Sequence, residues 1–186
     1  MNKIILIFGP PGSGKGTLSG FVAKQSELTH LSVGEMIREH IAAQDEIGKQ
    51  AEDLVNQGKL ISDDLTNQMV QHRLEKNPKE SFLLDGYPRD LLQARFLTGF
   101  ASIAGIIDVT LRDNIIVERL LKRGRADDNE QTIKDRIKLY HSTTEPVLSF
   151  LKEKNIPLLE VDGDYDMDAE VDAVVSRITD WLKTVA

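Results

Sequence analysis

Short apolar runs alternate with segments of helical period along the chain of 186 residues. Four runs rich in Ile, Leu and Val have the length of buried parallel strands, and a weaker fifth accompanies them; they lie at 3–9, 81–86, 105–111, 156–161 and 29–32. Between them, residues 63–76 place their apolar side chains within one half of a helical wheel. This alternation predicts an α/β fold, a doubly wound parallel five-stranded sheet flanked by helices.

Two regions depart from the simple alternation. Residues 34–61 contain two helical stretches with no strand between them, which predicts a small helical insertion that emerges from the second strand and could serve as a substrate-binding flap. Residues 122–129 are charged and predict an exposed loop, with Asp127 and Glu130 spaced as a capping box. Pro146 is expected to kink or divide the helical run from 130 to 154.

Composition excludes several classes of protein. The length predicts one domain, 1–186. The absence of cysteine excludes disulfides, thiol catalysis and cysteine-ligated zinc, and a net charge of −7 argues against a nucleic-acid partner. No apolar run reaches the ~18 residues of a membrane span, and the apolar start leads straight into a glycine loop, as a buried strand does and a signal peptide does not. Membrane and nucleic-acid partners are therefore not expected. The lack of cysteine is compatible with a reducing cytoplasm, and we expect a cytoplasmic protein and a monomer.

The segment "GPPGSGKGT", residues 9–17, joins the first apolar run to a helical stretch. Glycines let successive backbone N–H groups converge on phosphate oxygens, the helix N-terminus adds its positive dipole end, and Lys15 supplies a cation. A tight Gly-rich turn without a ligand is the alternative, but the strand, glycines, lysine and helix are all in register. The segment predicts a phosphate-binding P-loop.

One position of this loop is unusual. Generic P-loops carry Ser or Thr directly after the lysine as a Mg²⁺ ligand, whereas here Gly16 occupies that place and the hydroxyl comes one residue later, at Thr17. The metal must then be held mainly by phosphates and water. Asp85, at the end of a predicted strand, is the carboxylate expected to anchor those waters.

Six arginines stand at predicted strand ends and loops, where they bracket the P-loop: Arg38, Arg89, Arg119, Arg123, Arg125 and Arg136. A lone surface arginine usually belongs to a solvated face. A set of six is better explained by phosphoryl transfer between two polyanions, which needs several fixed cations around the migrating group.

Six motifs follow one another in a specific order over nearly the whole chain: "GPPGSGKGT", "LSVGEMIR" at 31–38, "GKLI" at 58–61, "DGYPR" at 85–89, "ERLLKRG" at 118–124 and "RADDN" at 125–129. In these motifs the sequence resembles the adenylate kinase and nucleoside monophosphate kinase family. The resemblance implies transfer of the ATP γ-phosphoryl group to a nucleoside monophosphate (NMP), with Mg²⁺ as cofactor and no zinc. It also implies an NMP-binding helical insertion at 32–61 and a short lid at 122–136.

The resemblance assigns a role to each matching position. The ATP-binding set comprises Gly12, Ser13, Gly14, Lys15, Gly16, Thr17, Arg119 and Gly163. The acceptor-binding set comprises Val33, Arg38, Lys59, Leu60, Ile61, Gly86, Tyr87, Pro88, Arg89, Gln93, Arg125 and Arg136. Within these sets Arg119 packs against the ATP base, Gly163 borders the adenine, and the Lys59–Ile61 segment lines the acceptor's base and sugar. The catalytic residues implied are Lys15, Arg89, Arg123, Arg125 and Arg136, acting by position and charge.

Three departures from the family pattern bear on activity. Val33 and Glu35 replace the usual Thr and Asp, a form closer to UMP/CMP kinases, whereas Gln93 matches the glutamine that reads adenine. We weight the base-contacting residue more and expect AMP as acceptor. The lid is also short, because Arg123 and Gly124 run directly into Arg125. A UMP/CMP kinase and an inactive nucleotide-binding scaffold stay as alternatives, whereas a switch GTPase is excluded because the N-K-x-D motif is absent.

Overall fold

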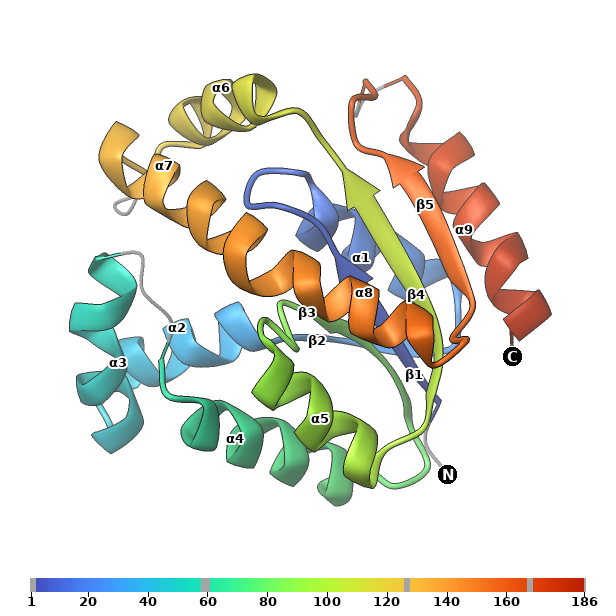
Figure 1. The fold of residues 1–186 in the computed structure, drawn as a ribbon, viewed down its shortest axis with the longest axis horizontal. Coiled ribbons are helices and arrows are strands. Elements are labelled where there is room, and N and C mark those ends of the chain that lie inside the picture. Colours follow the sequence, from blue (N-terminus) through green and yellow to red (C-terminus); the bar gives the residue numbers. More distant parts are fainter. Residues whose placement is uncertain (1–2, 58–60, 126–127, 167–168, 186) are drawn as a thin grey trace.

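The sheet of this protein has five parallel strands. The computed structural model describes residues 3–57, 61–125, 128–166 and 169–185. The strands are β1 (Ile4–Phe8), β2 (Leu28–Ser32), β3 (Ser81–Asp85), β4 (Ile103–Thr110) and β5 (Leu158–Asp162), in the spatial order β2-β3-β1-β4-β5. All four neighbouring pairs are parallel (Figure 1). The predicted α/β class and the five strands are confirmed, with β4 beginning two residues earlier than its apolar run indicated.

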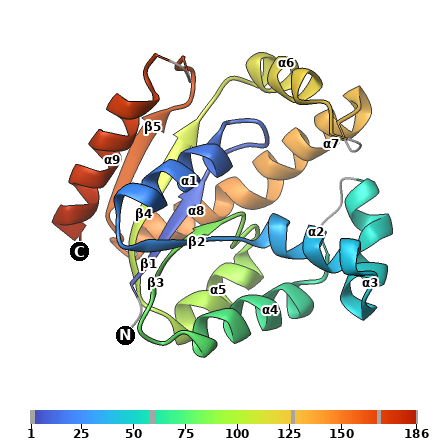
Figure 2. The ribbon, with the colours of Figure 1, turned by 180° about the vertical axis from the view of Figure 1, so that it is seen from behind.

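Helices cover both faces of this sheet. They are α1 (Lys15–Gln25), α2 (Val33–Ala43), α3 (Glu46–Asn56), α4 (Asp63–Lys76), α5 (Leu91–Phe100), α6 (Asp113–Arg123), α7 (Glu130–Leu139), α8 (Glu145–Glu153) and α9 (Val171–Val185). Helices α4, α5 and α8 lie on the face seen in Figure 1, and α1 and α9 lie on the opposite face, seen in Figure 2. Among the described residues, no helix is both long and apolar enough to cross a membrane.

Side chains of the central strand β1 point alternately to the helices on the two faces of the sheet. Ile4, Leu6 and Phe8 join the cluster formed with α2, α4, α5 and α8, while Ile5 and Ile7 join the one formed with α1 and α9. Successive side chains of a strand point to opposite faces, so a strand covered on both sides is apolar at every position. This is why its sequence forms a continuous apolar run.

Helix α9 packs closely on β4. A Cβ added at Gly105 of β4 would come within 2.7 Å of the Trp181 ring on α9. The indole therefore lies almost on the strand backbone, where only glycine leaves room for it. Trp181 is thus a packing residue of this layer.

The long helical run after residue 129 is interrupted, as Pro146 predicted, but the irregularity precedes the proline. Residues Tyr140–Thr144 form a π-helical segment, in which the Glu145 N–H bonds to the Tyr140 carbonyl. Pro146 lies in the first turn of α8, where its missing N–H is tolerated. At the other end, Asn129 caps α7 through the Thr132 N–H at 3.0 Å, and Asp127, the predicted capping residue, lies outside the described residues.

Candidate active site

The functional segments meet at one edge of the sheet. Because every strand is parallel, the carboxyl ends of all five lie at the same edge, where ligands bind in open α/β sheets. The P-loop follows β1, α2 follows β2, the "DGYPR" segment follows β3, α6 follows β4, and the Gly163 loop follows β5. The topology thus brings the predicted motifs to one place.

The P-loop has the backbone that its glycines predict. Gly12 and Gly14 have φ values of 81° and 84°, a region that favours glycine, and Gly14 caps α1. A Cβ at Gly12 would also lie 2.9 Å from Cγ of Leu120 on α6. No side chain caps the N-terminus of α1. Its backbone N–H groups and its positive dipole end therefore face the loop, an arrangement suited to phosphate.

Lys15 is the first residue of α1, and its ammonium donates a hydrogen bond to the Pro10 carbonyl at 3.2 Å. The pKa of Lys15 is lowered to about 8, first by burial and then by the positive charges of Arg89, Arg136 and Arg123, against the opposing effect of Asp85. An anion bound here would relieve this repulsion. The lysine lies in a site with an excess of positive charge.

Asp85 is the buried carboxylate of the site, at the end of β3. Burial alone would raise its pKa, but His30, with Nε2 3.5 Å from Oδ2, and the charges of Lys15 and Arg89 outweigh this and lower the pKa. A Cβ at Gly16 would lie 3.3 Å from the same Oδ2. Thus the position that carries a hydroxyl in generic P-loops abuts a carboxylate here. Gly16 and Thr17 are themselves at the start of α1, where Thr17 is exposed.

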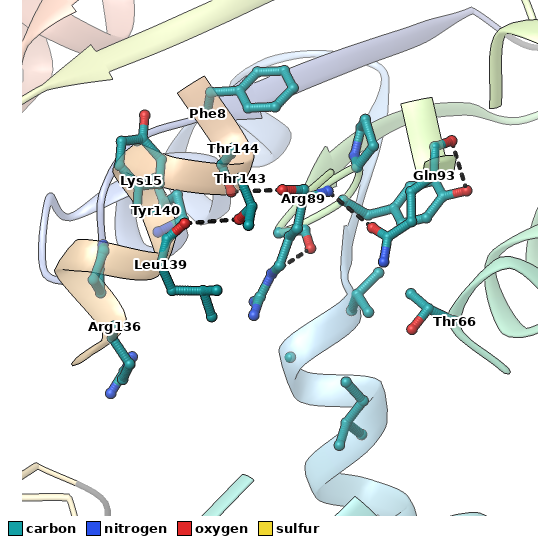
Figure 3. Close-up of a pocket in the computed structure, with 18 of the residues that line it drawn as sticks. Phe8, Lys15, Thr66, Arg89, Gln93, Arg136, Leu139, Tyr140, Thr143 and Thr144 are labelled. Carbon is teal, nitrogen blue, oxygen red and sulfur yellow. Dashed lines mark hydrogen bonds between the residues drawn. The ribbon is translucent and has the colours of Figure 1, made fainter. Parts of the chain in front are cut away.

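Arg89 lies at the centre of the pocket, between the helix that carries Arg136 and the helix that carries Gln93 (Figure 3). Its Nε donates to the Gly86 carbonyl at 2.9 Å, and its own carbonyl accepts a hydrogen bond from Thr144 Oγ1 at 2.8 Å. Burial lowers the pKa of Arg89, and Arg136 and Arg38 lower it further, against Asp85. The guanidinium is held in place next to like charges.

The pocket around Arg89 gathers most of the predicted acceptor residues. Its lining includes Val33, Arg38, Ile61, Gly86, Tyr87, Pro88, Gln93 and Arg136, together with Lys15 of the P-loop. Two lining residues also have hydrogen-bond partners in the protein. Tyr87 donates to Asn67 Oδ1 at 2.6 Å, while the Gln93 amide accepts from the Arg89 N–H and donates to Asp63. Lys59 and Leu60 lie outside the described residues.

The predicted lid arginines gather around a carboxylate, Asp128. Arg123 makes two hydrogen bonds to it, at 2.8 and 2.7 Å, and Arg136 a third at 3.2 Å, while the main-chain N–H of Arg125 donates to it at 3.2 Å. Burial alone would raise the pKa of Asp128, but these groups together lower it. Arg136 lines the pocket, whereas Arg123 and Arg125 are not among the described residues that do so.

Arg119 and Gly163, both predicted to border the ATP base, lie side by side. Arg119 donates to the Gly163 carbonyl at 2.8 Å. Gly163 in turn donates to the Thr110 carbonyl at 2.7 Å, and a Cβ on it would lie 3.2 Å from the Ser13 carbonyl of the P-loop. The two residues therefore lie next to the phosphate loop, where a nucleotide base could follow its phosphates.

Four residues of this site could not be identified individually from the sequence. Asp128 belongs to the "RADDN" motif and stands five residues after Arg123, but the motif alone does not indicate that this carboxylate binds the arginine. His30, Asp63 and Thr144 contact the site from far along the chain: Asp63 is 30 residues from its partner Gln93, and Thr144 is 55 from Arg89. No local pattern indicates such contacts.

Comparison with known proteins agrees with this arrangement. A family model described as adenylate kinase matches residues 7–156. A protein named adenylate kinase from Prochlorococcus marinus (strain MIT 9515) is 42% identical over 174 residues, covering 88% of this chain and 93% of its own. Another of that name, from strain NATL2A of the same species, is 38% identical over 173 residues, covering 90% and 94%. A third, from Synechococcus sp. (strain WH7803), is 36% identical and covers 96% and 97%. The chain belongs to the adenylate kinase family.

Proposed function

We propose that the protein transfers the γ-phosphoryl group of ATP to AMP, giving two molecules of ADP. Family membership and the names of the relatives support this activity. The observation that carries it is the convergence of Lys15, Arg89 and Arg136 with Asp85 where the P-loop meets the pocket. Two polyanions can be held together only where several fixed cations offset their repulsion.

ATP is assigned to the P-loop side of the site. The backbone of Gly12–Thr17 would cradle its phosphates, and the Lys15 ammonium would follow the migrating charge. The Arg119–Gly163 pair, which lies beside the Ser13 carbonyl, would border the adenine. Because α1 has no side-chain cap, its first N–H groups can donate to phosphate oxygens.

AMP is assigned to the pocket between α2, α4 and α5. Arg38 and Arg89 would bind its phosphate, and Gln93 would contact its base. Val33 and Ile61, both buried, would provide apolar walls. An oxygen of the AMP phosphate then attacks the γ-phosphorus as the bond to the β-phosphate oxygen breaks. The protein forms no covalent intermediate, since fixed charges and alignment supply the catalysis.

The donor set at this site suits a Mg²⁺ ion that Asp85 would hold through water. The described residues contain no group of three or more side chains that could hold a metal, and Asp85 stands as a single ionised carboxylate beside the N-terminus of α1. A magnesium ion keeps several waters and binds substrate phosphates, which suits one carboxylate acting through water. When bound with ATP, the ion neutralises charge on the β- and γ-phosphates.

The moving parts and the setting of the protein are further proposals. We assign segment 32–61 as the AMP-binding insertion and 122–136 as a short lid, supported by the projection of α2 and α3 beside α7 (Figure 1). In the lid, Arg123, Arg125 and Arg136 would exchange their contacts with Asp128 for contacts with phosphate. This exchange would carry them toward the transferring group. We also propose a monomer that acts in the cytoplasm.

The deciding experiment measures turnover of the purified protein. MgATP is offered with AMP, GMP, UMP and CMP in turn, and the diphosphates are separated and quantified. We expect ADP formation with AMP as the preferred acceptor, and about a 10²-fold or greater loss of kcat/KM in Lys15→Ala. Absence of diphosphates with all four acceptors, or equal rates in Lys15→Ala, would refute the proposed function.

A further inference from the structure

The amide of Gln93 is held in a single orientation by two partners of opposite kind. Its Oε1 accepts a hydrogen bond from the Arg89 main-chain N–H at 2.9 Å, and its Nε2 donates to Asp63 Oδ1 at 2.8 Å. A backbone N–H can only donate, and an ionised carboxylate can only accept. Turning the amide over would therefore set donor against donor and acceptor against acceptor.

A second carboxylate supports the same arrangement. Asp90 caps α5 by accepting from the Gln93 main-chain N–H at 2.9 Å. Burial raises the pKa of Asp90, and the neighbouring Asp63 carboxyl raises it further, against the bond from the Gln93 main-chain N–H. Through its bond to the Gln93 amide, Asp63 joins the start of α4 to the start of α5.

The fixed amide still has capacity for a ligand. A primary amide has two N–H donors and two acceptor lone pairs, and the two contacts above use one of each. Gln93 is only 2% exposed and lines the pocket, so its remaining groups meet a ligand in a dry environment. There an unmatched donor or acceptor is costly.

We infer that Asp63 is a positioning residue that sets which donor–acceptor pattern of a base the pocket accepts, by fixing the orientation of the Gln93 amide. Adenine and cytosine carry an exocyclic amino donor, whereas guanine and uracil carry a carbonyl acceptor at the corresponding place. One fixed amide orientation matches one of these two classes, and only a reversed amide matches the other. With AMP as the proposed acceptor, the fixed orientation is the one for bases that carry the amino group.

The inference rests on the proposed function, and the test separates the two. kcat/KM is measured for AMP and GMP, which have the same purine frame, with saturating MgATP. Asp63→Ala should lower the AMP:GMP ratio by about tenfold, the scale of one hydrogen bond to a charged group. Asp63→Asn keeps an acceptor oxygen and should recover part of the ratio.

The neighbouring Asp64 is the matched control. It lies in the same first turn of α4 and carries the same charge, but it is exposed. Asp64→Ala should leave the AMP:GMP ratio within about twofold. Because both substitutions remove one negative charge from the helix N-terminus, a general effect on α4 would appear in both variants.

A double-mutant cycle separates positioning from a structural role. In a Gln93→Met background no amide is left to orient, so Asp63→Ala should change the AMP:GMP ratio less than about twofold. A ratio lowered equally in both backgrounds, lowered equally by Asp64→Ala, or unchanged in Asp63→Ala overturns the inference. If no acceptor is phosphorylated, the proposed function fails, and the same comparison of dissociation constants for AMP and GMP decides the inference alone.

Discussion

The lowered pKa of Lys15 predicts how activity depends on pH. Its value of about 8 means that the ammonium is about 90% protonated at pH 7, about half at pH 8 and about 10% at pH 9. ATP phosphates bind the charged form. The charge is therefore present below pH 8 and lost as the pH rises through 8, so kcat/KM for MgATP should be level near pH 7 and fall to about a tenth by pH 9.

The assay is the rate of ADP formation at low MgATP and low AMP, so that neither substrate occupies the enzyme, measured from about pH 7 to about pH 9.5 at constant ionic strength. kcat/KM reports the free enzyme, where phosphate does not yet stabilise the ammonium. Bound phosphates should raise the pKa again, so kcat should stay level further into alkaline pH. Calorimetry in two buffers of different ionisation enthalpy should show proton uptake on ATP binding near pH 8.

Lys15→Arg is the matched control, because a guanidinium keeps its charge over this whole range. Its activity is expected to be lower, but its profile should not bend near pH 8. A wild-type profile level up to about pH 9.5, or the same bend in Lys15→Arg, would refute the reasoning that links burial and neighbouring arginines to the charge of Lys15.

Three further outcomes are expected. Arg89→Ala should lower kcat/KM by about 10²-fold or more without changing the circular dichroism spectrum, and near-wild-type turnover would contradict the placement of Arg89 at the transfer centre. Gly105→Ala should lower the free energy of unfolding by about 1 to 3 kcal/mol in urea titrations, because its Cβ would lie 2.7 Å from the Trp181 ring, and an unchanged value would show that α9 adjusts freely. A mimic that joins two adenosines through five phosphates should slow hydrogen exchange in α3 and α7, whereas equal exchange in the free and bound protein would favour a rigid binding module.

Local chemistry explains how much of the fold could be predicted. The buried strands form continuous apolar runs because both faces are covered, and α4 has the predicted bounds, since Ser62 caps it and its apolar side chains share a face. Helix ends were harder: α7 is capped by Asn129 through a side-chain geometry that several neighbouring polar residues could have supplied. The π-helical segment before Pro146 depends on packing that no local pattern encodes.

The site could be predicted as a set of motifs and not as a network. Glycines, Lys15 and the arginines have spacings that reflect backbone and charge requirements, and parallel strands bring them to one edge. Which partner each side chain takes is decided across the chain, as with Asp63 and Gln93, 30 residues apart. Gln93 lines the pocket, yet its sequence position could not indicate that half of the hydrogen-bonding capacity of its amide is already used by the protein.

The π-helical segment has a consequence for the alignment of Arg136 with Arg89. In a regular α-helix, residues eight apart are turned about 80° from one another, whereas residues seven apart lie within about 20°. Arg136 and Thr144 are eight apart, and both face the pocket, Thr144 by its bond to Arg89. The wider π-turn accommodates one extra residue, so Arg136 and Thr144 lie on the same side of the helix, as residues seven apart do in a regular α-helix. Deleting a single residue from 140–144 would leave a regular helix in which the two positions lie seven apart and stay in phase. A regular helix without the deletion would instead turn them about 80° apart, so the irregular turn sets the alignment of Arg136 with the helix face that holds Arg89.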